Sequence, residues 1–217
     1  MGFRALAPYV WPIYGPWMSA SLGMSLLLVA LPIFLVGDGY GYAVASSVAG
    51  AGGAGAAAGA LPAGWATDRW VRDRVGAGSL LAMAGSAAVM TTSGTVAILG
   101  FGHFVFGAGA LGVLLSRQAD LTRRIPPLLR GRAMSLMGGT MRFSVLLGTI
   151  VGGTLVDVAG ARWTFGAAGL GAAIGIPAVL PGALKPEREV APIGAGGPGL
   201  FEAVSYTHLT LPTTPYV

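Results

Sequence analysis

The sequence contains no cysteine and only two histidines, His103 and His208. The absence of cysteine excludes disulfides, thiol catalysis and cysteine-based metal sites, and two histidines are too few for a histidine-rich metal cage. Charged residues are also scarce, at 10% of the 217 residues, whereas a soluble domain carries about 25%. The mean hydropathy is +0.72. So few charges cannot cover a water-facing surface, and we therefore expect an integral membrane protein.

Apolar residues form six runs, each close to the length of about 20 residues that a membrane-spanning helix needs. The runs cover approximately residues 11–36, 41–63, 75–90, 95–115, 134–156 and 163–180. They predict an all-α integral membrane bundle of six transmembrane helices within residues 1–182, followed by the start of a cytoplasmic linker at 183–203. Trp11, Tyr14 and Trp17 are expected to anchor the first span at the lipid headgroups.

Arginine is concentrated in two clusters between the spans, at residues 64–74 and 117–132. A six-span topology places 11 of the 13 Lys and Arg residues on one side of the membrane, with Arg162 on the other side and Arg142 within the fifth span. The positive-inside rule then predicts a multi-pass protein of the bacterial plasma membrane with its N-terminus in the cytoplasm. Asp120 and the arginines from Arg123 to Arg132 are expected in a solvated loop. The net charge of +5 therefore indicates a lipid bilayer as partner and no nucleic acid.

The last 14 residues, 204–217, differ in composition from the chain before them. Residues 204–213 resemble the translation of a transposase-based sequencing adapter. We expect the natural sequence to end near Ala203 and residues 204–217 to be a non-native tail, which leaves His208 without a function. The alternative is a genuine polar tail.

The second span is nearly all Ala, Gly and Ser, and residues 50–55 match the dinucleotide-binding pattern G-x-G-x-x-G. No β-branched strand precedes this match and no acidic residue follows it at the spacing that nucleotide binding requires. Small residues at this density favour close helix packing instead. We expect no cofactor and no metal.

Two polar residues inside the spans are candidates for binding substrate or coupling ions. Arg142 either lines a central cavity, where it would bind an anionic group or pair with an acid, or reaches back to the cytoplasmic interface. His103 either relays protons, because histidine titrates near neutral pH, or is packed and hydrogen-bonded. No Asp or Glu lies within the six runs, so a proton-carrying carboxylate is not expected at membrane depth.

The loop after the second span resembles the pattern Gly-x-x-x-Asp-Arg-x-Gly-Arg of major facilitator superfamily transporters. Gly64, Asp68, Arg69 and Arg72 match it, and Val71 stands where the second glycine is expected. Together with the six spans, this is similar to the amino-terminal half of such a transporter. The resemblance implies a twelve-helix fold whose carboxy-terminal six-helix half is missing here, with Asp68 and Arg69 locking the two halves together in the outward-facing state.

Two further stretches extend the resemblance. Gly148, Gly152 and Gly153 keep the glycines of a helix-packing motif in the fifth span of antiporters, with Thr149 in place of its proline. Residues 116–119 and 130–135 are similar to bacterial drug-efflux members. The implied function is alternating-access transport of a small molecule, with drug export against proton entry as one form. The alternative is a six-helix membrane protein with a structural or assembly role, and an enzyme is not expected.

Overall fold

The computed structural model describes residues 10–184, which form helices joined by short turns. Predictions that fall on residues 1–9 and 185–217, including the adapter-like tail and nearly all of the linker, lie outside the described residues. The elements are η2, a single π-helical turn (Val10–Tyr14), and α2 (Gly15–Gly37), α3 (Tyr42–Arg69), α4 (Arg72–Thr92), α5 (Val96–Arg124), α6 (Pro127–Ala159), α7 (Ala161–Ile174) and α8 (Ile176–Ala183).

Among the described residues, six helical segments are long and apolar enough to cross a membrane. The predicted all-α bundle of six transmembrane helices is therefore confirmed. The helices are longer than the apolar runs, since α3 continues to Arg69 and α5 to Arg124. The hydrogen-bonded ladder of a helix does not require apolar side chains, so it continues where the chain leaves the hydrocarbon.

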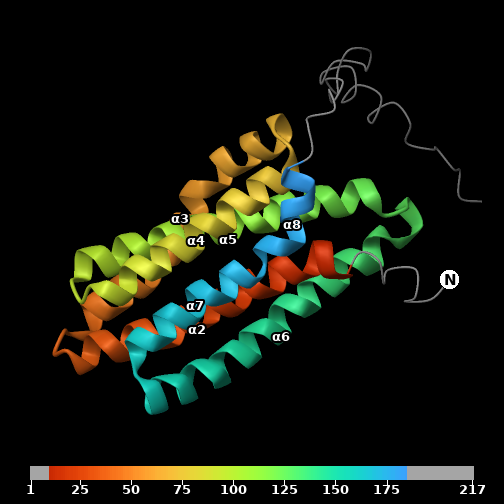
Figure 1. Cartoon of the computed structure of the whole chain (residues 1–217). Helices are drawn as coiled ribbons and strands as arrows, with labels where there is room; N and C mark the ends of the chain where they lie inside the picture. The colour runs from red at the N-terminus through yellow and green to blue at the C-terminus, as the bar shows by residue number, and fades with distance from the viewer. Residues whose placement is uncertain (1–9, 185–217) are drawn as a thin grey trace, which may run out of the picture. The chain divides into compact units, whose positions relative to one another are not determined.

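The helices pack in two groups of three (Figure 1). One group contains α3, α4 and α5, and the other contains α2, α6 and α7. Contacts of α4 with α7 and of α2 with α5 join the groups, and α8 packs on α4. This arrangement brings the first turn of α4 close to the last turn of α8.

Apolar side chains and bare backbone fill the interior of the bundle. Leu27, Leu31 and Phe106 are fully buried, and Phe165 packs edge-on against Phe34 with 5.6 Å between the ring centroids. Lipid tails are as apolar as leucine, so close packing rather than escape from water holds such helices together.

Glycine residues allow the closest contact between two helices, α3 and α5. A Cβ on Gly55 of α3 would overlap the carbonyl oxygen of Phe104 in α5, and one on Gly107 of α5 would overlap that of Gly52. Helices α3 and α5 therefore touch through their backbones, which any larger residue at these positions would prevent.

The start of the first span differs from the expectation. Tyr14 and Trp17 are buried, with 4% and 6% of their surface exposed, and do not anchor the span in the headgroups. The Tyr14 hydroxyl donates to the Ala133 carbonyl at 3.0 Å, and Trp17 Nε1 donates to the Met137 carbonyl at 3.3 Å. The polar tips of these aromatic side chains find acceptors on α6, so they do not need the interface.

The predicted sixth span is broken into α7 and α8 at Gly175. Pro177 has no N–H to donate to the preceding turn, which interrupts the helical ladder. The break lies close to α2, because a Cβ on Gly175 would lie 2.5 Å from Ser19 Oγ. The break positions α8 against the first turn of α4.

Candidate functional site

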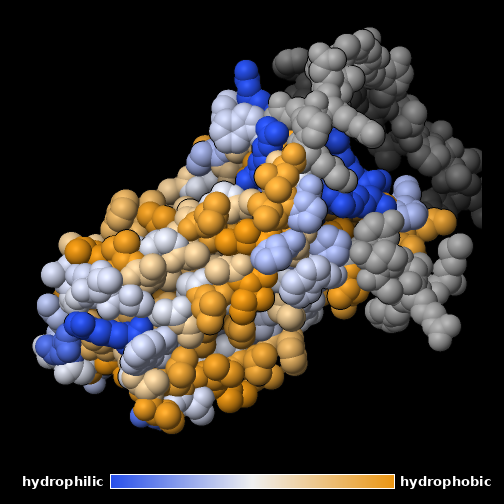
Figure 2. All heavy atoms as spheres, viewed as in Figure 1, coloured by the Kyte–Doolittle hydropathy of each residue, from blue (hydrophilic) through white to orange (hydrophobic). Residues whose placement is uncertain are grey.

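Hydrophilic residues gather at the two ends of the helices, and hydrophobic surface covers the band between them (Figure 2). The end where α3 meets α4 and α5 meets α6 carries most of the arginines, and we call it the arginine-rich end. Its described arginines are Arg69, Arg72, Arg74, Arg117, Arg123, Arg124, Arg130 and Arg132.

The predicted gating motif lies on helix ends and not on an open loop. Helix α3 ends at Arg69 and α4 begins at Arg72, so only Trp70 and Val71 connect them. Asp68 and Arg69 are exposed. The guanidinium of Arg69 lies over the Trp65 ring, 5.5 Å from its centroid. The motif therefore presents one negative and one positive side chain outward from a short, helix-bounded connection.

A charge network lies directly behind this motif, and of its four residues only Arg124 is exposed. One of its two acids is Asp73, which the sequence analysis did not single out. Arg117 of α5 is fully buried, and its Nη2 lies 2.8 Å from Asp73 Oδ1 on α4. Its Nη1 lies 3.2 Å from Asp120 Oδ2, one helical turn further along α5. Arg124 closes the network, with its Nη2 3.3 Å from Asp73 and 3.0 Å from Asp120.

The expectation that Asp120 lies in a solvated loop is wrong. Asp120 is only 5% exposed, because α5 continues past it and turns it toward α4. Arg117, Asp120 and Arg124 stand three and four residues apart, so they share one face of the helix. This spacing, together with an acid at the start of α4, is the signal in the sequence that could have revealed the network.

Two backbone carbonyls also contact Arg117, whose buried Nε has no hydrogen-bond partner among the described residues. Its Nη1 donates to the Pro12 carbonyl and its Nη2 to the Arg72 carbonyl, both at 3.2 Å. Two carboxylates and two carbonyls thus surround a charge that would be very costly if buried alone. The network contains two arginines and two aspartates and so carries no net charge.

The network also contacts the end of the last helix. A Cβ on Gly182 of α8 would overlap the Asp73 carboxylate, and Arg74 Nε donates to the Ala183 carbonyl at 3.0 Å. A Cβ on Gly76 would lie 3.0 Å from Arg117 Nη2. Bare glycine backbone therefore lets α8 lie against the Asp73 carboxylate and lets α4 lie close to the Arg117 guanidinium.

His103 lies inside the bundle, 1% exposed, between α5 and α3. Its Nδ1 is 2.9 Å from the Val48 carbonyl. A carbonyl can only accept, so Nδ1 carries the proton in this contact. Nε2 has no hydrogen-bond partner and faces Gly52, where a Cβ would lie 2.5 Å away. His103 thus links the two helices that approach most closely.

The remaining predicted residues lie along α6. Gly148 and Gly152 are buried against α2, where a Cβ on Gly148 would lie 2.6 Å from Ser25 Cβ. A Cβ on Gly153 would meet no atom within 4 Å. Arg142 is exposed. The structure therefore brings neither His103 nor Arg142 into the charge network at the arginine-rich end.

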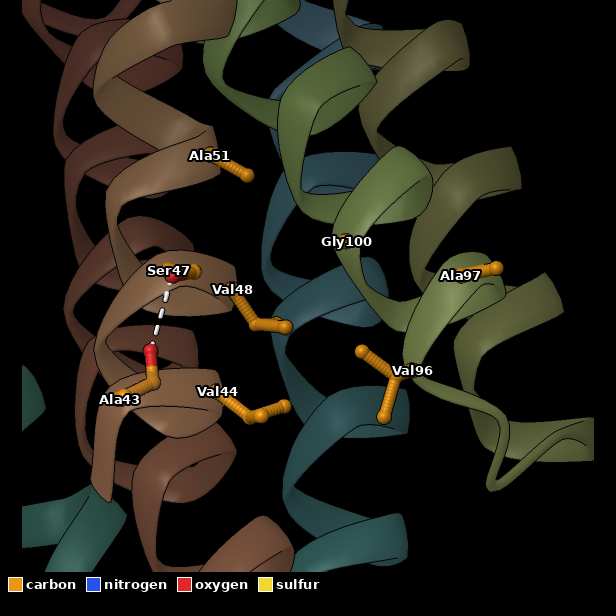
Figure 3. Close-up of a pocket in the computed structure, with 8 residues that line it drawn as sticks. All are labelled: Ala43, Val44, Ser47, Val48, Ala51, Val96, Ala97 and Gly100. Atoms are coloured by element: carbon orange, nitrogen blue, oxygen red, sulfur yellow. Dashed lines mark hydrogen bonds between the residues drawn. The ribbon is translucent and has the colours of Figure 1, made fainter. Parts of the chain in front are cut away.

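A shallow apolar hollow of about 440 Å³ lies between α3 and α5, away from the arginine-rich end (Figure 3). The side chains of Val44 and Val48 on α3 point across it toward Val96 on α5. The one hydroxyl in its lining, that of Ser47, donates to the Ala43 carbonyl at 2.8 Å. The hollow offers no group for catalysis. Within residues 10–184, no group of three or more His, Cys, Asp or Glu residues could hold a metal ion.

Six apolar helices with charged ends define a multi-pass membrane protein. Comparison with known proteins identifies its family: residues 18–211 match the model of the Major Facilitator Superfamily. The chain belongs to this family, whose members are membrane transporters.

Curated relatives add a narrower likeness. Two proteins named "Multidrug resistance protein B homolog", from two strains of Mycobacterium tuberculosis, are each 32% identical to this chain over 103 residues. The aligned region covers 48% of this chain and 19% of each relative. The chain therefore spans only about a fifth of the length of these curated relatives.

Proposed function

We propose that this chain forms the amino-terminal half of a twelve-helix secondary transporter that exports small drug-like molecules by alternating access. The observation that carries the proposal is the arrangement at the arginine-rich end. Asp68 and Arg69 are exposed at the end of α3, beside the two-residue connection. The buried Asp73, Arg117 and Asp120, together with the exposed Arg124, fix the helix that follows. A rigid base beneath an exposed pair of charges suits a contact that must form and break as two halves rock.

Burial of the individual helices supports a second six-helix half as partner. In an apolar 18-residue stretch of each span, 28% is buried in α3 and 17% in α6. The corresponding share in the other four spans is 39% to 50%. In a two-half transporter the substrate site lies between the halves, so some helices must turn a face toward the partner half. We assign that role to α3 and α6.

The proposed setting is the plasma membrane of a bacterium, with the arginine-rich end in the cytoplasm. The described arginines favour this orientation, since eight of them lie at that end and only Arg162 lies at the other. The names of the mycobacterial relatives support drug export as the activity.

The proposal is tested by measuring drug accumulation in an efflux-deficient bacterium that expresses the full-length protein containing this chain. We expect the full-length protein to lower accumulation, and Asp68→Asn to abolish most of that effect by removing a charge from the exposed pair. Asp157→Asn is the matched control, because Asp157 is an exposed aspartate at the far end of α6. Full export by the Asp68→Asn variant would overturn the gating role.

The same accumulation assay tests whether export is coupled to protons through His103. Among the described residues, His103 is the one histidine, and it lies within a span. If His103 carries the coupled proton, His103→Gln removes the dependence of export on the proton gradient. An unchanged dependence places the proton carrier on other helices.

The 217-residue chain alone is expected to show no saturable flux in vesicles, since it supplies only one wall of the transport path. Such flux would contradict the half-transporter assignment.

A further inference from the structure

Arg142 lies near the middle of the membrane-spanning part of α6. Ten residues separate it from Arg132 at the arginine-rich end and 15 separate it from the exposed Asp157. At 1.5 Å per residue these distances are about 15 Å and 22 Å along the helix axis. The hydrocarbon layer is about 30 Å thick, so the Cα of Arg142 lies deep within it.

Arg142 points away from the rest of the described bundle. The buried face of α6 contains Met137, Ser144 and Gly148, and it packs on α2. Successive residues of a helix are about 100° apart, so Arg142 lies about 200° from Ser144, nearly opposite this face. Its neighbours Phe143 and Leu146 are 59% and 62% exposed.

No hydrogen bond or ion pair joins Arg142 to another residue within 10–184. Long side chains on a helix lean over the preceding turn. That turn carries Gly138 and Gly139, where a Cβ would meet no atom within 4 Å. The guanidinium is therefore bordered by bare backbone toward the arginine-rich end and by apolar side chains on its other flank.

A charged side chain at this depth is very unfavourable against lipid, so in membrane proteins it faces a water-filled cavity or a charge of opposite sign. The described part of the bundle supplies no such charge to Arg142. We propose that Arg142 binds the carboxylate of an amphipathic substrate, whose apolar part lies against Phe143 and Leu146. This inference rests on the proposed transport function and names its substrate class as anionic amphiphiles. The planar guanidinium suits a carboxylate, because it can donate two parallel hydrogen bonds.

The carboxylate could also belong to an acidic side chain of the other half of a transporter, and the experiment separates the two sources. The 217-residue chain is placed in phosphatidylcholine nanodiscs, which carry no net lipid charge. The probes are a dansyl-labelled undecanoic acid and its methyl ester, and binding is followed by dansyl fluorescence. The unmodified chain and its Arg142→Gln, Arg142→Lys and Arg123→Gln variants are compared, and their far-ultraviolet circular dichroism verifies the helical fold.

We expect the unmodified chain to bind the acid about tenfold more tightly than the ester, as a hydrogen bond to a charged group allows. Arg142→Gln should abolish this preference, and Arg142→Lys should retain part of it. Arg123→Gln should leave it intact, because Arg123 is exposed at the arginine-rich end. Equal binding of acid and ester by the unmodified chain overturns the proposal, as does a preference that survives Arg142→Gln or is lost with Arg123→Gln.

The full-length protein provides the second arm. A preference for the acid in both the short chain and the full-length protein supports a substrate carboxylate. If only the short chain prefers the acid probe, an acidic side chain of the other half pairs with Arg142 in the full-length protein. That result overturns the substrate assignment. Both readouts are binding, so loss of drug export with an intact acid preference would count against the proposed export function and not against this site.

Discussion

At the scale of single residues, Arg117 shows how a chain with few charges uses one of them inside its fold. Its guanidinium is fully buried and contacts two aspartates and two backbone carbonyls. Removing Arg117 would leave two buried aspartates with the exposed Arg124 as the charged partner that the network still holds, which costs more than the pair contributes when intact.

Arg117→Gln should therefore lower the free energy of unfolding by about 3 kcal/mol. Arg123→Gln, at an exposed arginine, should change it by less than about 0.5 kcal/mol. Unfolding in mixed micelles of a mild detergent and sodium dodecyl sulfate, followed by tryptophan fluorescence, measures both. A double-mutant cycle with Asp73→Asn should show a coupling of about 1 kcal/mol or more. Additive effects would show that the two residues act independently.

At the scale of helices, glycine decides where two elements can touch. The same helix α3 carries Gly55, whose Cβ would overlap the Phe104 carbonyl, and Gly53, whose Cβ would meet nothing within 4 Å. The two positions have the same residue and the same helical backbone. They differ only in what lies beside them, which makes them a matched pair.

Gly55→Ala should destabilise the bundle by about 1–3 kcal/mol, because α3 and α5 would have to move apart. Gly53→Ala should be neutral or stabilising by about 0.5 kcal/mol, since alanine favours the helix more than glycine does. Thermal unfolding in detergent micelles compares the two variants directly. Equal stability of the two variants would show that the α3–α5 backbone contact is not needed for the fold.

At the scale of the whole molecule, the uneven distribution of arginine predicts how the bundle is inserted. The absence of cysteine from all 217 residues permits a clean test, because any introduced thiol is the only one. Tyr40, in the turn between α2 and α3, and Arg123, at the arginine-rich end, are both exposed and lie on opposite sides in the proposed orientation.

In intact bacteria, a thiol reagent that cannot cross membranes should label Tyr40→Cys and should not label Arg123→Cys. Permeabilised cells should show labelling of both, because the positive-inside rule places the arginine-rich end in the cytoplasm. Mass spectrometry of the purified chain reports the modification. Labelling of Arg123→Cys alone in intact cells would reverse the proposed orientation.

The sequence by itself determined the number of membrane-spanning segments and the medium they occupy. Six apolar runs and a charged fraction of 10% are compatible with few folds other than a bundle of membrane-spanning helices, because each run must satisfy its backbone hydrogen bonds inside a membrane. It also located Asp68 and Arg69, since a short charged connection between two apolar runs must lie near water. The exact helix ends could not be read from hydropathy, because the charged residues of α3 and α5 continue the helical ladder.

Only the tertiary structure decided which polar groups meet. Asp73 and Arg117 are 44 positions apart, and the spacing of Arg117, Asp120 and Arg124 shows only that they share a face of α5, not that this face packs against Asp73. The packing of α4 and η2 on α5 surrounds Arg117 with acceptors, whereas the packing of α6 on α2 turns Arg142 outward. The environment of each charge depends on contacts between distant segments, because a helix fixes only which of its own residues share a face.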